Sequence, residues 1–183
     1  ICSDPVLHGF VLNLYLNGEE YPHRIDDYFP VWAVPDGHLL DEMKSHMRDE
    51  DKHVALYRKA IRKIDQPIVE FPLPDVYNEI IRSYTSQSFR IEQDDMADQR
   101  TFKIANVFAH LHFLEKRIAR SLEFHLDGCA ASASNYPEKA VGIVFSDEQH
   151  HVNYTRDAVL HLLPAERAKK VLASHKRAEA RAN

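Results

Sequence analysis

The pattern Asp-Glu-x-x-His occurs twice in this chain, in the stretches HMRDEDKHVAL and FSDEQHHVNYT. Its members are Asp49, Glu50 and His53 in the first copy and Asp147, Glu148 and His151 in the second. The segments around the two copies otherwise differ, so the pattern itself is what they share. Apolar residues recur at steps of three and four in both segments, which is typical of amphipathic helices.

The position of each glutamate on its helix predicts that its side chain points inward. Heptad steps from Met43 lead through Glu50 to Tyr57, and heptad steps from Val141 lead to Glu148. The histidine three residues further along each helix lies on the same face. A carboxylate buried among apolar side chains is costly unless its charge is compensated, and a bound cation compensates it. The repeat therefore predicts two neighbouring metal ions inside a helical fold.

The rest of the chain predicts an all-α fold. The five glycines fall near the ends of segments rather than at hairpin spacings. Periodicity predicts helices over residues 5–21, 38–64, 75–86, 98–126, 137–163 and 164–183. Four long amphipathic helices with a crossover subdomain are the components of a four-helix bundle. We expect one domain over residues 1–183, with its bundle core at about 5–163, its crossover at about 66–100 and an extra C-terminal helix at about 164–183.

A pair of metal ions in a bundle core usually requires a further carboxylate from each of the two remaining helices. Glu115 replaces an apolar residue in a run that includes Phe108 and Leu111, so it is predicted to face inward. If the stretch LDGCAASASNYP reverses the chain, Glu115 lies level with Glu148 and His151. We therefore expect these three residues to share an ion.

The first helix offers two adjacent candidates, Glu19 and Glu20, in the stretch LYLNGEEYPH. Neither of them cleanly continues the face that Leu7, Val11 and Leu14 define. We prefer Glu20 as the ligand and keep Glu19 as the alternative.

This ligand pattern resembles the ferritin-like di-iron carboxylate superfamily, whose members use one Glu from each of two helices and a Glu-x-x-His from each of the other two. The matching residues are Glu20, Glu50, His53, Glu115, Glu148 and His151. Their spacing resembles the oxygenase branch, in which the second and third helices are far apart in sequence. The resemblance implies a ferritin-like bundle with a crossover helix between helices 2 and 3. It also implies two iron ions, with manganese or a mixed Mn/Fe pair as alternatives, and a crossover that shapes a substrate pocket.

The resemblance gives three more residues a role. Asp49 and Asp147 resemble acceptors that hold the Nδ1 proton of a ligating histidine and leave the other ring nitrogen for the metal. The alternative is that both are solvent-facing helix acids. His46 lies one turn before Glu50 and resembles the additional histidine ligand of the p-aminobenzoate N-oxygenases. A hydrogen-bonded core histidine is the alternative.

The expected function is that of an O₂-activating, non-haem di-iron oxygenase, either a hydroxylase or an N-oxygenase, acting on a small organic substrate. An external reductase or ferredoxin must supply electrons, because the chain contains no Gly-rich nucleotide loop and no iron–sulfur cysteine set. A ferroxidase, peroxidase or catalase-like protein with iron or manganese is the alternative. The third hypothesis is a helical interaction protein in which these acids and histidines form a buried polar network. The resemblance also suggests a homodimer.

Charge, hydropathy and cysteine content exclude several other classes. The formal charge of −5 argues against a nucleic-acid partner, which normally requires a concentrated basic face. No apolar run reaches the ~20 residues of a membrane span. Cys2 and Cys129 can form at most one bridge, and no CxxC is present, so neither a disulfide framework nor a cysteine zinc site is expected. A reducing, cytoplasmic setting fits this cysteine content best.

His125 lies near the end of the predicted bundle, and we expect it to have a structural role.

Overall fold

The computed structural model describes residues 1–182 except 36, 72, 86–89 and 133–134, and only the backbone of 73–75, 77, 78 and 135. Over these described residues the chain is helical, without β-strands, which confirms the expected all-α class. In chain order the elements are α1 (Pro5–Glu19), the 3-10 helix η1 (Pro22–Arg24), α2 (His38–Lys63), α3 (Leu73–Tyr84), α4 (Ala97–Ser132), α5 (Asn135–Leu162) and α6 (Ala165–Ala182).

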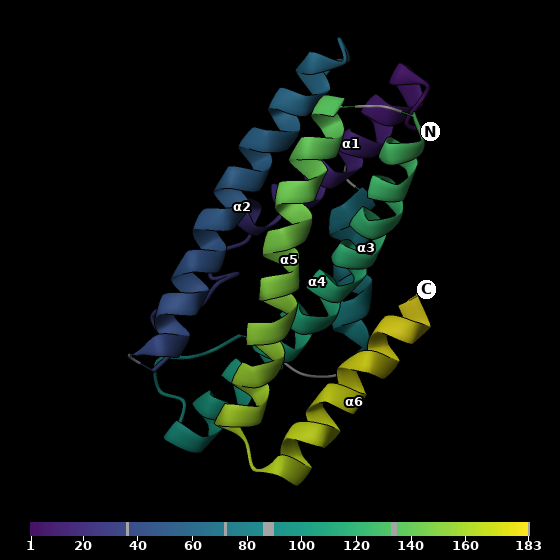
Figure 1. The fold of residues 1–183 in the computed structure, drawn as a ribbon. Helices are drawn as coiled ribbons and strands as arrows, with labels where there is room; N and C mark the ends of the chain where they lie inside the picture. The colour runs from purple at the N-terminus through teal and green to yellow at the C-terminus, as the bar shows by residue number, and fades with distance from the viewer. Residues whose placement is uncertain (36, 72, 86–89, 133–134, 183) are drawn as a thin grey trace.

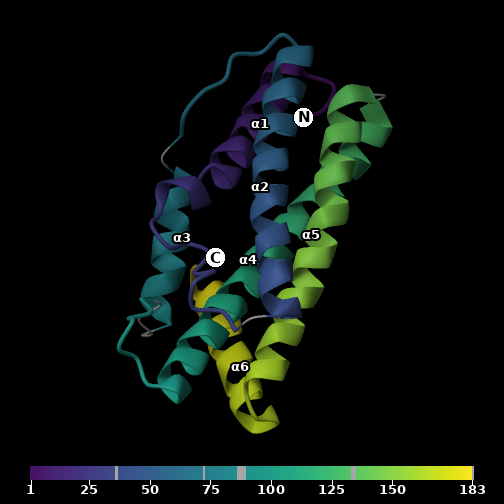
Figure 2. The same ribbon diagram turned by 90° about the vertical axis from the view of Figure 1, so that its left-hand side faces the viewer.

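Four helices, α1, α2, α4 and α5, lie side by side (Figures 1 and 2). α1 and α2 run in opposite directions, as do α4 and α5, whereas α2 and α4 run in the same direction. This is possible because the segment that contains α3 returns the chain from the end of α2 to the other end of the molecule (Figure 2). α4 packs most extensively against α5, and α2 packs against both α1 and α5.

Two asparagines of α1 hold the first part of the crossover against the bundle. Asn13 donates its amide N–H to the carbonyl of Pro67 (3.0 Å) and accepts the N–H of Val69 (2.8 Å). Asn17, one turn further along, donates to the carbonyl of Val69 and accepts the N–H of Phe71, both at 2.8 Å. These bonds give the extended segment 67–71 the partners that a neighbouring strand would otherwise supply.

The apolar interior is divided into two clusters of buried side chains. One cluster includes Met43, Phe108 and Val159, and the other includes Leu16 and Tyr57. Along α2, α4 and α5, the candidate glutamates lie between the residues of one cluster and those of the other. The polar side chains therefore form a layer across the middle of the core.

Within the described residues, no helix combines the length and apolar character that a membrane crossing requires.

α4 is longer than its sequence pattern predicts, because it ends at Ser132 rather than at Leu126. The expected stop rested on Gly128 and the small residues that follow it. A glycine inside a helix costs only about 1 kcal/mol relative to alanine, and two alanines at 130 and 131 favour continuation. The extra turns carry Cys129 within the helix.

The C-terminal helix α6 packs against α3, α4 and α5, and one of its buried residues is His175. Nε2 of His175 lies 3.1 Å from Oδ1 of Asn106, to which it donates, and the ring of His175 lies 6.4 Å from that of His110. Burial lowers the pKa of His175 to about 4. Burial, together with the charge of Arg82, lowers the pKa of His110 to about 3. Both imidazoles are therefore neutral in the folded protein at pH 7.

This burial makes folding sensitive to acid. Between pH 6.5 and 4 the unfolded chain binds a proton at residue 175 that the folded chain excludes, so stability falls as pH falls. We expect His175→Gln, which keeps a donor for Asn106, to reduce the loss of stability between pH 7 and 5 by about 2 kcal/mol. Urea unfolding at both pH values measures this difference. The exposed variant His161→Gln serves as control, and equal losses in wild type and His175→Gln contradict the prediction.

Candidate metal centre

Acid and imidazole side chains from four helices converge in the polar layer of the core. They are Glu19 from α1, Glu50 and His53 from α2, Glu115 from α4, and Glu148 and His151 from α5. None of them is more than 5% exposed. Five of these six were predicted from the sequence as ligands, and the structure brings those five together.

The ligand atoms form overlapping groups in which all atoms lie within 4.8 Å of one another. The groups are Glu19, Glu50, His53 and Glu148; Glu115, Glu148 and His151; and His46, Glu50 and His151. Glu50, Glu148 and His151 each belong to two groups. These shared residues link the groups into one cluster, in which the carboxylates of Glu50 and Glu148 lie between neighbouring positions that a cation could take.

Glu148 lies between the two histidines. Its Oε1 is 3.4 Å from Nδ1 of His53, and its Oε2 is 3.1 Å from Nδ1 of His151. Nδ1 of His53 also lies 3.3 Å from Oε2 of Glu19. Both histidines thus turn the same ring nitrogen, Nδ1, toward the carboxylates.

The leading aspartate of each motif contacts the histidine of the other motif. Nε2 of His53 lies 3.0 Å from Oδ2 of Asp147, and Nε2 of His151 lies 3.4 Å from Oδ2 of Asp49. Lys52 joins the two acids, with its Nζ 2.5 Å from Oδ1 of Asp49 and 2.8 Å from Oδ2 of Asp147. The aspartates therefore accept from histidine as the sequence suggested, but from Nε2 rather than Nδ1. This geometry leaves Nδ1 of each histidine for a metal.

His46 lies at the edge of the same layer. Its Nε2 is 3.0 Å from Oε1 of Glu50 and 3.3 Å from Oε1 of Glu115, and its Nδ1 is 2.6 Å from the hydroxyl of Tyr154. Its ring stacks on that of His151, with centroids 3.7 Å apart. His46 is therefore close enough to the carboxylates to serve as an additional metal ligand.

The first helix contributes Glu19 to the cluster rather than Glu20. Glu20 is only partly buried and forms ion pairs with Arg24 and Arg58. The preference for Glu20 failed because the face used to judge it was wrong. Leu7 is 50% exposed, whereas Leu12 and Leu16 are fully buried, and a step of three from Leu16 leads to Glu19. Glu19, the alternative kept from the sequence, is the residue that the fold places in the cluster.

Burial raises the pKa of most of these carboxylates. Burial first, and then the charges of neighbouring acids, raise the pKa of Glu50 to about 8 and that of Glu148 well above its usual range. Burial raises the pKa of Glu19 to about 8 as well. In Glu115, burial acts in the same direction, but the hydrogen bond and charge of His46 outweigh it and lower the pKa to about 2. Without metal, the layer holds most of its carboxylates in the protonated form.

The residues of the layer fit a pair of divalent cations. Four carboxylates can balance two such ions, and mixed carboxylate and imidazole ligands suit iron or manganese. Among the described residues, Oε1 of Glu148 is buried without a hydrogen-bond partner, because its approach to His53 lacks hydrogen-bond geometry. A buried polar oxygen without a partner is costly, and a cation would engage it. Metal binding at such a site must displace the carboxylate protons.

A cavity of about 540 Å³ borders the layer. Its lining includes Glu19, Glu50 and Glu115, and α3 contributes Val76 and Ile80. Most of the remaining lining is apolar or aromatic. The volume falls within the range of small-molecule sites, about 300–1,000 Å³.

Comparisons of this chain with models of protein families, with curated proteins and with solved structures find no match.

Two contacts of the site were not predicted from the sequence. Lys52 lies three residues after Asp49, a helical spacing that could have indicated their ion pair. Tyr154 lies one turn before the buried Ala158 and three residues after His151, which places it on the inward face beside His46. The pairing of each aspartate with the opposite helix could not be read from either motif alone.

The adjacent glutamates of α1 provide a matched test of the ligand set. We expect Glu19→Gln to lower bound iron or manganese from about two ions per chain to one or fewer, because a ligand of the cluster is lost. Glu20→Gln should retain the full content, because it removes only ion pairs outside the layer. Elemental analysis after reconstitution and desalting measures both variants. Equal metal content in the two variants contradicts this assignment.

Proposed function

We propose that this protein is a ferritin-like dinuclear metal oxidoreductase that uses O₂ to oxidise a small, largely apolar organic molecule. The observation that carries the proposal is the convergence of four buried glutamates and two buried histidines from four helices on a layer beside an apolar cavity. An apolar interior tolerates such a layer when cations neutralise it.

The order and direction of the helices support the ferritin-like assignment. In that superfamily a long crossover connects helices 2 and 3, and two helices each carry a Glu-x-x-His motif. Here α2 and α5 carry the two motifs, and the segment with α3 connects α2 to α4. Glu19 and Glu115 are the carboxylates that the two other helices, α1 and α4, contribute to the layer.

The residues of the layer divide into holding and supporting groups. Glu19, Glu50, His53, Glu115, Glu148 and His151 would hold two iron or manganese ions, and His46 would add a further donor. Such a metal pair, when bound, supplies the binding and reduction of O₂. Asp147 and Asp49 fix the rings of His53 and His151 through their Nε2 atoms. Histidine orientation of this kind strengthens metal binding by about 10–100-fold.

The cavity favours an organic substrate over iron or peroxide alone. Its largely apolar lining suits an aromatic or aliphatic molecule, and the three glutamates in the lining put such a molecule beside the metal-binding layer. Tyr28 also lines the cavity, and its buried hydroxyl has no hydrogen-bond partner among the described residues. Burial raises the pKa of Tyr28 well above its usual range, so the hydroxyl stays neutral and can donate to a polar group of the substrate.

The first test is anaerobic reconstitution with ferrous iron. We expect about two irons per chain, and rapid O₂ uptake when O₂ is added to the reduced protein. A reductant such as reduced ferredoxin should sustain the uptake, because the chain carries no electron-transfer cofactor motif of its own. An oxygen electrode and elemental analysis give both quantities.

A peroxide challenge of the same sample distinguishes the alternative use of the site. Sustained O₂ release from hydrogen peroxide would assign a catalase-like function instead of an oxygenase. Failure to retain any metal would leave a helical interaction protein with a buried polar network.

The cavity itself can be tested at Gly18, which lines it. A Cβ at this position meets no heavy atom within 4 Å, and leucine is favoured over glycine in a helix by about 1 kcal/mol. We expect Gly18→Leu to keep both metals but to lower substrate oxidation by roughly tenfold or more, because its side chain occupies substrate space. Mass spectrometry of aromatic amines, phenols and fatty acids after turnover measures the added oxygen.

Gly142→Ala is the matched control for this variant, because Gly142 lies on α5 and does not line the cavity. Unchanged product formation in Gly18→Leu contradicts the role of the cavity, whereas a loss of metal would indicate damage to α1 instead.

A further inference from the structure

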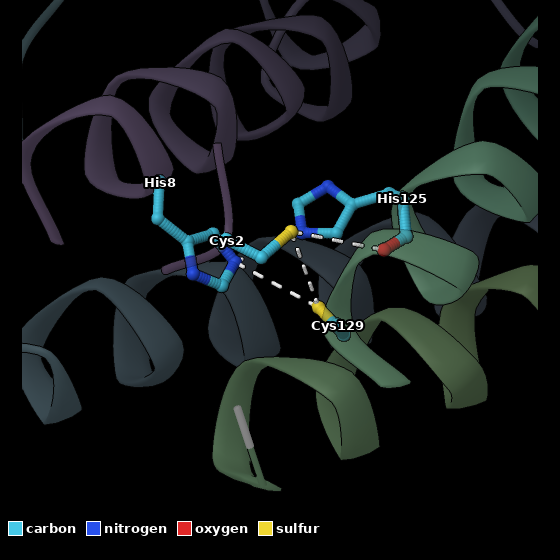
Figure 3. Close-up of side chains that lie close together, drawn as sticks. All are labelled: Cys2, His8, His125 and Cys129. Atoms are coloured by element: carbon cyan, nitrogen blue, oxygen red, sulfur yellow. Dashed lines mark hydrogen bonds between the residues drawn. The ribbon is translucent and has the colours of Figure 1, made fainter. Parts of the chain in front are cut away.

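A second group of metal-binding side chains lies away from the dinuclear layer, where the start of α1 meets the last turns of α4. It consists of Cys2, His8, His125 and Cys129, which point toward one another in Figure 3. One ligand atom from each residue lies within 4.8 Å of the other three. We propose that these four residues bind one Zn²⁺ ion in a closed, structural site. This inference does not depend on the function proposed for the dinuclear centre.

The separations of the ligand atoms are close to those of a tetrahedral zinc site. The sulfur atoms of Cys2 and Cys129 are 3.7 Å apart, and the Nε2 atoms of His8 and His125 are 2.9 Å apart. Sγ of Cys129 lies 4.0 Å from Nε2 of His8. Zinc bonds of about 2.3 Å to sulfur and 2.0–2.1 Å to nitrogen put two thiolates about 3.8 Å apart and two imidazole nitrogens about 3.3 Å apart. Small side-chain movements would complete the geometry.

The two histidines face each other in the way that shared coordination requires. Each directs Nε2 toward the other ring, an arrangement in which two lone pairs repel unless a proton or a cation lies between them. Nδ1 of His125 lies 3.3 Å from the hydroxyl of Tyr15. When Nδ1 donates its proton to Tyr15, the lone pair of His125 is left on Nε2, where the metal would bind.

Local structure brings these residues together from distant parts of the chain. His125 and Cys129 lie one turn apart on α4, and a turn closed by the backbone N–H of Asp4 carries Cys2 back over the start of α1. Gly128 permits the approach, because a Cβ at that position would lie 3.1 Å from Sγ of Cys2. Gly128, at which the sequence predicts the end of the helix, instead leaves room for the sulfur atom of Cys2.

The donor chemistry differs from that of the dinuclear layer and selects a different ion. Two thiolates and two imidazoles suit zinc, whereas carboxylate-rich sets suit iron or manganese. Both cysteines are free thiols in the structure. Zinc binding converts both thiols to thiolates and releases their protons to solvent, with no change of oxidation state. Four protein ligands leave no open position for a substrate, so the site is structural rather than catalytic.

The expectation that no cysteine zinc site exists was based on the absence of a CxxC pair, and this proposal revises it. The ligands come instead as Cys-x₅-His before and within α1 and His-x₃-Cys within α4. α1 packs chiefly against α2, while the 540 Å³ cavity lies between Gly18 of α1 and Leu114 and Ile118 of α4. Zinc would join α1 to α4 beyond the end of that cavity.

Cobalt substitution tests the site with a signal that carboxylates cannot give. We expect the full chain, purified under reducing conditions, to bind Co²⁺ with intense near-ultraviolet absorption from thiolate-to-metal charge transfer. One equivalent of Zn²⁺ should abolish that absorption. Glu148→Ala should retain it, because the dinuclear layer contains no sulfur, and Cys129→Ser should lose it. Retention in Cys129→Ser, or loss in Glu148→Ala, overturns the proposal.

Two further measurements keep the proposal testable if Cys129→Ser does not fold. Tyr15→Phe leaves all four ligands and should keep the cobalt absorption while weakening zinc binding by roughly tenfold. X-ray absorption of the wild-type zinc form should give two sulfur and two nitrogen neighbours. A zinc shell without sulfur, or a mass lower by two hydrogens that shows a Cys2–Cys129 disulfide in the protein as isolated, overturns the assignment.

Discussion

The burial of four carboxyl groups among apolar side chains is the constraint on which the polar layer of this fold depends. Glu19, Glu50, Glu115 and Glu148 are each almost completely buried, and an uncompensated buried charge costs several kcal/mol. Without metal, protons on most of these carboxyls and the positive charge that they favour on His46 limit the cost. The pKa of His46 illustrates this balance, because burial alone would lower it, whereas Tyr154, Glu115 and Glu50 raise it well above its usual range.

The polar layer also explains the division of the core. Each of α2, α4 and α5 contributes apolar residues to both clusters and interrupts that apolar face at the layer. Both sides of the layer are therefore apolar, which strengthens the electrostatic interactions within it. The outer edge is closed by Asp49, Asp147 and Lys52, so α2 and α5 exchange equivalent contacts across their interface. A site built in this way is held by helices rather than by loops, which is the arrangement that keeps ligand positions most precise.

The helices and five residues of the polar layer could be predicted from the sequence, because both depend on regular spacing along a single helix. Glu50 and Glu148 lie at heptad spacing from apolar residues of their own helices, and Glu115 takes the place of an apolar residue on the inward face of α4. The same spacing could not decide between Glu19 and Glu20. The buried face of α1 includes the polar residues His8, Asn13 and Asn17 as well as leucines, so its apolar periodicity is weak. The Cys2–His8–His125–Cys129 group was beyond such reasoning altogether. Its members meet only after a backbone turn and the close approach at Gly128 have formed, and neither follows from periodicity.

The hydrogen bonds of Asn13 and Asn17 on α1 also affect the cavity beside the layer. Because Asn13 and Asn17 bond the backbone of residues 67–71, they attach the chain that leads toward α3 to the helix that carries Glu19. Gly18 borders the cavity from α1 and Ile80 borders it from α3, while Leu114 and Ile118 border it from α4. Two amide side chains outside the polar layer thus help to set the width of the space beside it.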